Sequence, residues 1–103
     1  MNRIGLLKEV KRKVLEVTPE ADIILYGSRA RNTSVAGSDW DFLILIDGNP
    51  NILTDKIRHK IYEIEWSTGE VLSSIVRTRK EWNSKRYKSL PFYKNILKDG
   101  VRA

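Results

Sequence analysis

Two short apolar runs in the first half of the chain enclose one polar stretch. The runs cover residues 23–26 and 42–46, and neither contains a charged side chain. Short apolar runs bounded by turn residues are typical of buried strands. Between them lie a glycine–serine pair, two arginines and two aspartates spaced two residues apart. The chain is therefore expected to place a charged connection between two buried strands.

The two aspartates, Asp39 and Asp41, are expected to share one face of the second strand, because side chains alternate along a strand. Two neighbouring carboxylates repel, and the repulsion raises the pKa of one of them. A bound divalent cation relieves that repulsion, so the pair indicates a metal site. Gly27 lets the backbone turn and lets phosphate oxygens approach closely. Ser28 adds a hydroxyl and is expected to begin a short helix over 29–33, whose first N–H groups suit an anion.

Two simpler interpretations remain open for the same stretch. The glycine–serine pair could be an ordinary capped turn that carries surface arginines. The aspartates could cap a turn, or they could pair with Arg29 or Arg31.

The order of these residues resembles the DNA polymerase beta-like nucleotidyltransferase superfamily, in particular its minimal nucleotidyltransferases. The signature of that family is Gly-Ser or Gly-Gly, a spacer, and Asp-x-Asp followed by an apolar residue. Here Gly27 and Ser28 are followed by the spacer 29–38 and by the Asp-Trp-Asp-Phe segment 39–42. Asn32 stands where the family commonly has glycine, and asparagine tolerates a left-handed backbone.

The resemblance implies an enzyme that transfers a nucleoside monophosphate, AMP from ATP, to a hydroxyl acceptor. It implies two Mg²⁺ ions, held by Asp39 and Asp41 as catalytic and metal-binding residues. Two metal ions about 3.5–4 Å apart can serve both the attacking and the leaving oxygen. The residues that we expect to bind the nucleotide are Gly27, Ser28, Arg29 and Ser38.

Fully active members of the superfamily usually carry a third carboxylate on the next strand, which is expected here over 71–76. At the matching place this chain has Ser73 or Ser74. Serine cannot replace the charge of a carboxylate, so the resemblance leaves the rate of transfer in question. Three glutamates are alternative sources of the acid: Glu63, Glu65 and Glu70.

Three functions therefore stay open. The first is a Mg²⁺-dependent nucleotidyltransferase. The second is a nucleotide-binding, antitoxin-like partner of a HEPN-type helical protein, because minimal nucleotidyltransferases often pair with such proteins in toxin–antitoxin systems. The third is a basic RNA-binding domain in which the aspartates are structural. Nucleic acid and a second copy of the chain are further partners that the sequence leaves open.

The size and composition of the chain exclude several other classes of protein. Its 103 residues are expected to form one nucleotidyltransferase domain over 1–103. The absence of cysteine and the single histidine, His59, exclude disulfides, a three-histidine zinc site and a histidine-based triad within the chain. No apolar run reaches about 18 residues, and the N-terminus lacks the apolar core of a signal peptide. We therefore expect a cytoplasmic protein with no membrane partner.

The formal net charge is +6. This excess suits a polyanionic partner such as a nucleotide, RNA or an acidic protein surface. A surface of ordinary solvated lysines is an equally good interpretation of the composition alone.

The remaining periodicity predicts an α+β fold with the element order α-β-α-β-α-β-α-α. Amphipathic helices are expected over 3–17 and 52–66, and strands over 23–26, 40–46 and 71–76. The resemblance adds that the three strands form a small mixed sheet, with helices packed on it and with the second and third strands adjacent. The apolar stripe expected on the first helix is Ile4, Leu7, Val10, Val14 and Val17.

The C-terminal part of the chain is expected to be helical and rich in aromatic contacts. Thr78 and Glu81 match a capping box that opens a short helix. Pro91 opens another helix, which Gly100 ends. We interpret the aromatic side chains of this part as core packing, and a base-stacking platform is the alternative: Trp82, Tyr87, Phe92 and Tyr93.

Overall fold

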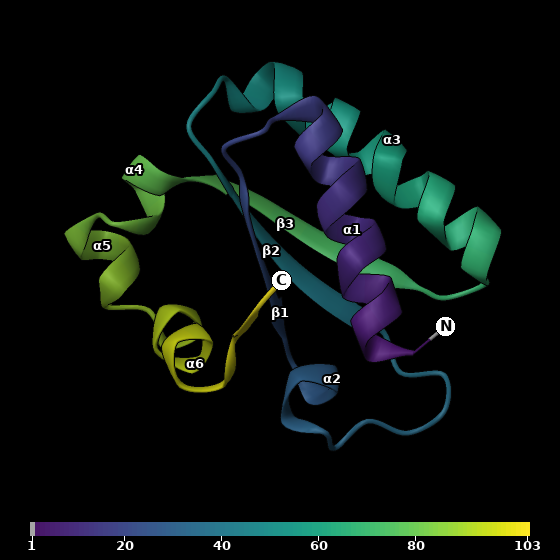
Figure 1. Cartoon of the computed structure of the whole chain (residues 1–103). Helices are drawn as coiled ribbons and strands as arrows, with labels where there is room; N and C mark the ends of the chain where they lie inside the picture. The colour runs from purple at the N-terminus through teal and green to yellow at the C-terminus, as the bar shows by residue number, and fades with distance from the viewer. Residues whose placement is uncertain (1) are drawn as a thin grey trace.

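The structure, a computed structural model, describes residues 2–103 and contains a four-stranded mixed sheet (Figure 1). The strands lie in the order β3-β2-β1-β4. Their bounds are β1 (Asp22–Tyr26), β2 (Trp40–Ile46), β3 (Leu72–Thr78) and β4 (Val101–Arg102). β1 runs antiparallel to β2 and to β4, whereas β2 and β3 run parallel. The expected adjacency of the second and third strands is confirmed.

Helices cover both faces of this sheet. Helices α1 and α3 pack on one face, and the shorter helices α4, α5 and α6 pack on the other (Figure 1). The helices are α1 (Arg3–Val17), α2 (Ser28–Arg31), α3 (Pro50–Thr68), α4 (Arg79–Trp82), α5 (Lys85–Lys88) and α6 (Pro91–Asp99). The fold is therefore α+β, as expected.

Strand β2 is central because both of its faces are apolar. Phe42 and Ile44 are fully buried beneath α1 and α3, while Leu43 and Leu45 are buried against the shorter helices. A strand of this kind buries both faces because helices cover each face of the sheet. Its single charged residue, Asp41, lies at the beginning of the strand.

Helix α1 buries a narrower stripe than the periodicity predicted. Leu6, Val10 and Val14 are fully buried, and they follow one another at spacings of four residues. Ile4 was expected on this stripe, but it is 66% exposed. The prediction is wrong there because Leu6, Val10 and Val14 define the buried side of the helix. Ile4 lies on the opposite side of the first turn. On α3, the burial of Ile57, Ile61 and Ile64 confirms the amphipathic helix expected over 52–66.

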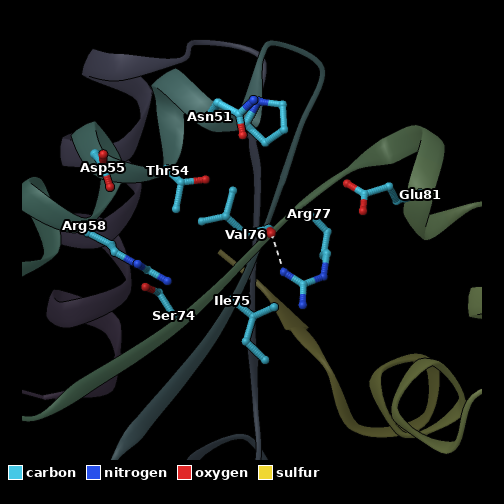
Figure 2. A pocket seen from close by; sticks show the side chains of 10 residues that line it. Asn51, Thr54, Asp55, Arg58, Ser74, Ile75, Val76, Arg77 and Glu81 are labelled. Carbon is cyan, nitrogen blue, oxygen red and sulfur yellow. Dashed lines mark hydrogen bonds between the residues drawn. The ribbon is translucent and has the colours of Figure 1, made fainter.

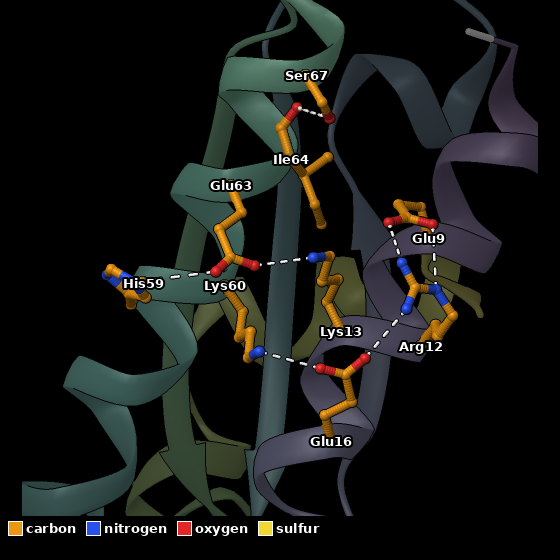
Figure 3. Close-up of polar contacts among 9 residues, drawn as sticks. All are labelled: Glu9, Arg12, Lys13, Glu16, His59, Lys60, Glu63, Ile64 and Ser67. Carbon is orange, nitrogen blue, oxygen red and sulfur yellow. Dashed lines mark hydrogen bonds and ion pairs between the residues drawn. The ribbon is translucent and has the colours of Figure 1, made fainter.

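Ion pairs join α1 to α3 on the outside of this layer (Figure 3). Lys13 Nζ lies 2.8 Å from Glu63, and Lys60 Nζ lies 3.0 Å from Glu16. Arg12 also pairs with Glu16, at 3.0 Å. Much of the basic face of α1 is therefore neutralised within the protein.

The aromatic side chains of the C-terminal part form a second core. The Trp82 ring lies 4.8 Å from the Tyr93 ring, 5.8 Å from Tyr87 and 5.9 Å from Phe92, between centroids. Trp82 is only 6% exposed and packs with Leu43 of β2. These contacts confirm the core-packing interpretation of the aromatic residues.

Two elements were not predicted: helix α5 and strand β4. Strand β4 has only two residues, so it has no periodicity that a sequence pattern could show. It pairs with Ile24 and Leu25 of β1, which gives the sheet four strands instead of the expected three. The predicted capping box is present, since the side chains of Thr78 and Glu81 each accept from the other's backbone N–H. Over residues 2–103, every helix is too short or too polar to cross a bilayer.

We expect Trp82→Ala to destabilise the fold by about 3–5 kcal/mol, the usual cost of truncating a large buried aromatic side chain. Trp66→Ala is the matched control, because Trp66 is 89% exposed. Its effect is expected to stay within about 0.5 kcal/mol. Urea unfolding followed by circular dichroism measures both values. Equal destabilisation by the two changes would contradict the second core.

Candidate functional site

The predicted turn is built on Gly27, which follows β1 and caps α2. Its backbone has φ 76° and ψ −160°, a region that is almost restricted to glycine. A Cβ atom at this position would lie 2.5 Å from Oδ2 of Asp41. Glycine is therefore required twice, for the backbone conformation and for the close approach of the Asp41 carboxylate.

The register of β1 and β2 brings Asp41 to the turn. Asp41 is the partner of Tyr26, the last residue of β1. Asp39 lies two residues earlier and is exposed, whereas Asp41 is half-buried. The structure therefore places the glycine–serine turn and the two aspartates at the same end of the sheet.

The environment of Asp41 disfavours its charged form. Partial burial and the neighbouring Asp39 carboxylate raise the pKa of Asp41 above its ordinary value. Burial and the charge of Asp41 likewise raise the pKa of Tyr26. A cation bound beside Asp41 would offset the cost of its charged form.

No basic side chain supplies that cation within residues 2–103. The ion pairs of the described chain include neither Asp39 nor Asp41. Arg29 instead donates two hydrogen bonds to the backbone carbonyl of Ser38, at 2.9 and 3.3 Å. Its guanidinium also lies 4.4 Å from the centre of the Trp40 ring. The alternative in which Arg29 or Arg31 pairs with the aspartates is therefore wrong for the described residues.

The loop that carries Asp39 is held by short local contacts. Ser38 Oγ accepts a hydrogen bond from the Val35 N–H, at 3.0 Å. Asn32 ends α2 with φ 59° and ψ 31°, a left-handed conformation. The expectation that asparagine replaces glycine at this turn is confirmed. Arg3 fixes the asparagine by donating to its side-chain oxygen, at 3.0 Å.

The place of a third carboxylate is taken by serine. Ser73 of β3 is the register partner of Asp41, and partners on parallel strands share a face of the sheet. Ser74 pairs with Phe42 instead, and it therefore lies on the opposite face. Serine thus occupies the position at which an acid would complete the group.

The three glutamates that could supply the acid are engaged elsewhere. Glu70 accepts a hydrogen bond from the Trp40 indole at 2.9 Å, and Glu65 accepts from the Leu72 N–H at 2.9 Å. Glu63 forms the ion pair with Lys13. Among residues 2–103, no group of three or more His, Cys, Asp or Glu side chains is arranged to hold a metal ion.

The paired aspartates nevertheless fit a magnesium ion that arrives with a nucleotide. Mg²⁺ is usually held by one or two carboxylates together with substrate phosphates, and it keeps several waters. The Asp41 carboxylate, pressed against the Gly27 backbone and without a cationic partner, matches this mode of binding. The residues present do not supply the full acidic set of a two-metal centre.

Sequence reasoning missed two side chains next to this site. Tyr26 contacts Asp41 across the strand pair, and the position of Tyr26 directly before the glycine was the available signal. Glu70 accepts a hydrogen bond from the indole of Trp40, the residue between Asp39 and Asp41. No sequence pattern indicates that hydrogen bond, because 30 residues separate its partners.

A cavity of about 520 Å³ lies elsewhere, towards the other end of β3 (Figure 2). It is bounded by the first turns of α3, by β3 and by Glu81 of α4. Arg58 and Ser74 point towards each other at its edge (Figure 2). Its lining includes Ser74 but none of the residues predicted to be catalytic or to bind metal or nucleotide. The carboxylates at the start of β2 are therefore the better candidate for the functional site.

A glycine turn against paired carboxylates, at the start of a central strand, suits the binding of phosphate and a divalent metal. A family model described as nucleotidyltransferase domain matches residues 4–102. The chain therefore belongs to the nucleotidyltransferase domain family, which confirms the resemblance to the polymerase beta-like superfamily. A search of the curated proteins gave no significant match. Membership indicates transfer of a nucleoside monophosphate from a nucleoside triphosphate, generally with a divalent metal.

We expect Gly27→Ala to displace the Asp41 carboxylate, because rotating that side chain is the cheapest way to relieve the contact. Gly37→Ala is the matched control: Gly37 has φ 86°, but a Cβ there would meet nothing within 4 Å. Both changes are expected to cost about 1–2 kcal/mol of backbone strain. Only Gly27→Ala should abolish the rise in Tm that ATP and Mg²⁺ produce. If ATP and Mg²⁺ still raise the Tm of Gly27→Ala, ligand binding does not depend on the close approach of the Asp41 carboxylate to Gly27.

The raised pKa of Asp41 predicts a pH-dependent stability effect. A carboxyl group whose pKa is higher in the folded than in the unfolded state destabilises the fold at every pH above the folded pKa. The effect disappears below the unfolded pKa, where both states are protonated. Asp41→Asn is therefore expected to raise the Tm of the metal-free protein at pH 7, and this gain should shrink in acid.

Thermal unfolding from pH 3 to pH 8 measures this gain. The control is Asp55→Asn, an exposed carboxylate outside the ion pairs of the described chain. A lower Tm for Asp41→Asn than for the unchanged protein at pH 7 would show that Asp41 is stabilised by a contact that the structure lacks.

Proposed function

We propose that the protein is a Mg²⁺-dependent nucleotidyltransferase that transfers AMP from ATP to a hydroxyl group. The observation that carries the proposal is the Asp41 carboxylate held against the Gly27 backbone, with its pKa raised and without a cationic partner. The choice of ATP rests on the resemblance to minimal nucleotidyltransferases. We further propose that residues 1–103 act as one domain in the cytoplasm.

In the proposed reaction, the hydroxyl oxygen attacks the α-phosphorus and pyrophosphate leaves. Asp39 and Asp41 would hold the metal, which would neutralise phosphate charge and polarise a phosphoryl oxygen. The Ser28 hydroxyl and the N–H groups that follow Gly27 bind the distal phosphates. The catalytic contribution of the chain is thus positioning and charge neutralisation.

Arg29 and Ser38, which were predicted to bind the nucleotide, act together in this proposal. The hydrogen bonds from the Arg29 guanidinium to the Ser38 carbonyl support a role in fixing the loop before Asp39. Arg29 is half-buried between that carbonyl and the Trp40 ring. A direct contact of either residue with phosphate remains a prediction.

A second function is favoured by the serine at the third acidic position. Without a carboxylate at Ser73, strand β3 offers no acid at the register partner of Asp41 to take the proton of the attacking hydroxyl. A nucleotide-binding partner of a HEPN-type helical protein, with weak or no catalysis, is consistent with such a site. We propose this antitoxin-like role as the alternative to efficient transfer.

We expect Asp39→Asn and Asp41→Asn each to reduce nucleotide transfer by at least about 100-fold, the usual scale for loss of one transition-state contact. Transfer is measured as label from α-³²P-ATP with Mg²⁺ and a candidate acceptor. Asp55→Asn is the control, because Asp55 is exposed on α3. If label moves equally in all three variants, the aspartates do not carry the reaction.

We expect Ser73→Asp to increase transfer about 10-fold or more, because a general base commonly contributes at least that much. The new carboxylate would stand beside Asp41 on the same face of the sheet. Ser74→Asp provides a control one residue away, on the opposite face, and it should give no increase. An unchanged rate in Ser73→Asp, in a variant that still binds ATP, would show that the missing acid does not limit the reaction.

A further inference from the structure

The positive charge of the chain is concentrated in its last quarter. Residues 77–103 contain nine of the 19 Lys and Arg residues but only two of the 13 Asp and Glu residues. This segment therefore carries a net charge of +7, whereas residues 1–76 carry −1. The net charge of +6 is a property of the segment that holds α4, α5 and α6, and not of the whole surface.

Six cations of this segment form what we call the basic surface. All six are exposed, and in the described chain none of them belongs to an ion pair. They lie on three consecutive helices that the aromatic core holds against the sheet. The basic surface consists of Lys80, Lys85, Arg86, Lys88, Lys94 and Lys98.

The side of the molecule formed by α1 and α3 differs from the basic surface, because ion pairs neutralise several of its cations. There Arg12, Lys13 and Lys60 are each matched by a glutamate on α1 or α3 (Figure 3). Self-neutralisation of this kind lowers the potential that a polyanion would meet. Four other cations of that side are also exposed and outside the ion pairs of the described chain: Lys8, Lys11, Lys56 and Arg58. The six unpaired cations of α4–α6 lie on shorter helices and are accompanied by fewer acids, so this part of the surface is the better suited to a polyanion.

The basic surface lies on the same side of the sheet as the proposed active site. Asp41 alternates with Leu43 and Leu45 along β2, and both leucines pack beneath α4 and α6. Phe92 of α6 contacts the ring of Tyr26 edge-on, with 5.2 Å between centroids. Tyr26 is in turn the register partner of Asp41. One aromatic contact thus links the helices of the basic surface to the carboxylate site.

We propose that the basic surface binds the backbone of a single-stranded RNA, and that the terminal ribose hydroxyl of this RNA is the acceptor. The second half of this statement rests on the proposed function. In the reaction the ribose oxygen bonds to the α-phosphorus of ATP and the bond to pyrophosphate breaks. The hydroxyl proton leaves to solvent water. The proposed path of the strand runs over α4–α6 and ends at Asp41.

The composition of this surface favours nucleic acid over an acidic protein. Protein–protein interfaces are depleted of lysine, whereas five of the six residues here are lysines. Nucleic-acid interfaces are much more positively charged. Asn83 and Asn95 are also exposed among these cations. Amide groups both donate and accept hydrogen bonds, as the 2′-hydroxyl of RNA does, which favours RNA over DNA.

Binding can be tested with a fluorescein-labelled single-stranded RNA of about 12 nucleotides, within the usual span of small single-strand-binding folds. Fluorescence anisotropy is measured at several salt concentrations, without ATP, using the Asp41→Asn protein. The test variant combines Lys85→Ala, Arg86→Ala and Lys88→Ala. The control combines Lys8→Ala, Lys11→Ala and Lys56→Ala, three exposed lysines of α1 and α3, and changes the net charge equally.

We expect RNA to bind the Asp41→Asn protein, and the test variant to lose at least about 10-fold in affinity. Its salt slope should fall by about 2, since each contact with single-stranded phosphate contributes about 0.7. The control should keep most of its affinity. Equal losses in both triple variants, equal binding of DNA of the same sequence, or equally strong competition by polyglutamate would each overturn the proposal.

The failure of this proposal can be distinguished from failure of the proposed function. RNA that binds but accepts no label would support RNA binding by the basic surface. It would contradict the claim that the terminal ribose hydroxyl is the acceptor. Label transfer to another acceptor, with no RNA binding, would support the proposed transferase activity. It would contradict RNA binding by the basic surface. Circular dichroism and Tm verify that both triple variants are folded.

Discussion

The approach of the Asp41 carboxylate to the backbone of Gly27 is the contact on which the rest of the site depends. No side chain fits between the two, since a Cβ at Gly27 would overlap with Oδ2 of Asp41. The antiparallel register of β1 and β2 creates this approach, and the buried apolar residues of β2 hold that register. A slip of one residue would turn every β2 side chain to the other face. The burial of the apolar β2 side chains and the position of Asp41 beside Gly27 therefore require the same register of β1 and β2.

The two faces of the sheet differ in what they carry. Helices α1 and α3 bury the larger core, and ion pairs between them neutralise part of their surface charge. The other face carries the carboxylates at one end and the aromatic core beneath α4–α6. It also carries the six cations of the basic surface, which belong to no ion pair of the described chain. In the proposed function, one face of the sheet supports the fold, and the other face binds the nucleotide and an anionic acceptor.

The sequence predicted the parts of this molecule that depend on local pattern. The left-handed turn at Asn32 and the central strand β2 follow from single-residue preferences and from an apolar run. Three kinds of feature escaped it. The exposure of Ile4 depends on where α1 crosses the sheet, and strand β4 is too short for any period. The engagement of Arg29 with the Ser38 carbonyl depends on loop geometry that residue types do not encode.

The central claim is that Asp41 and a nucleotide together hold one divalent ion. Mn²⁺ has the same preference for carboxylate and phosphate oxygens as Mg²⁺, and its free form is seen by electron paramagnetic resonance. Titrating Mn²⁺ into the protein with ATP should remove more free signal than ATP alone removes. Asp41→Asn should lose that extra binding, while Asp55→Asn should keep it. Equal extra binding in both variants would contradict the account, because the metal would then not depend on the carboxylate beside Gly27.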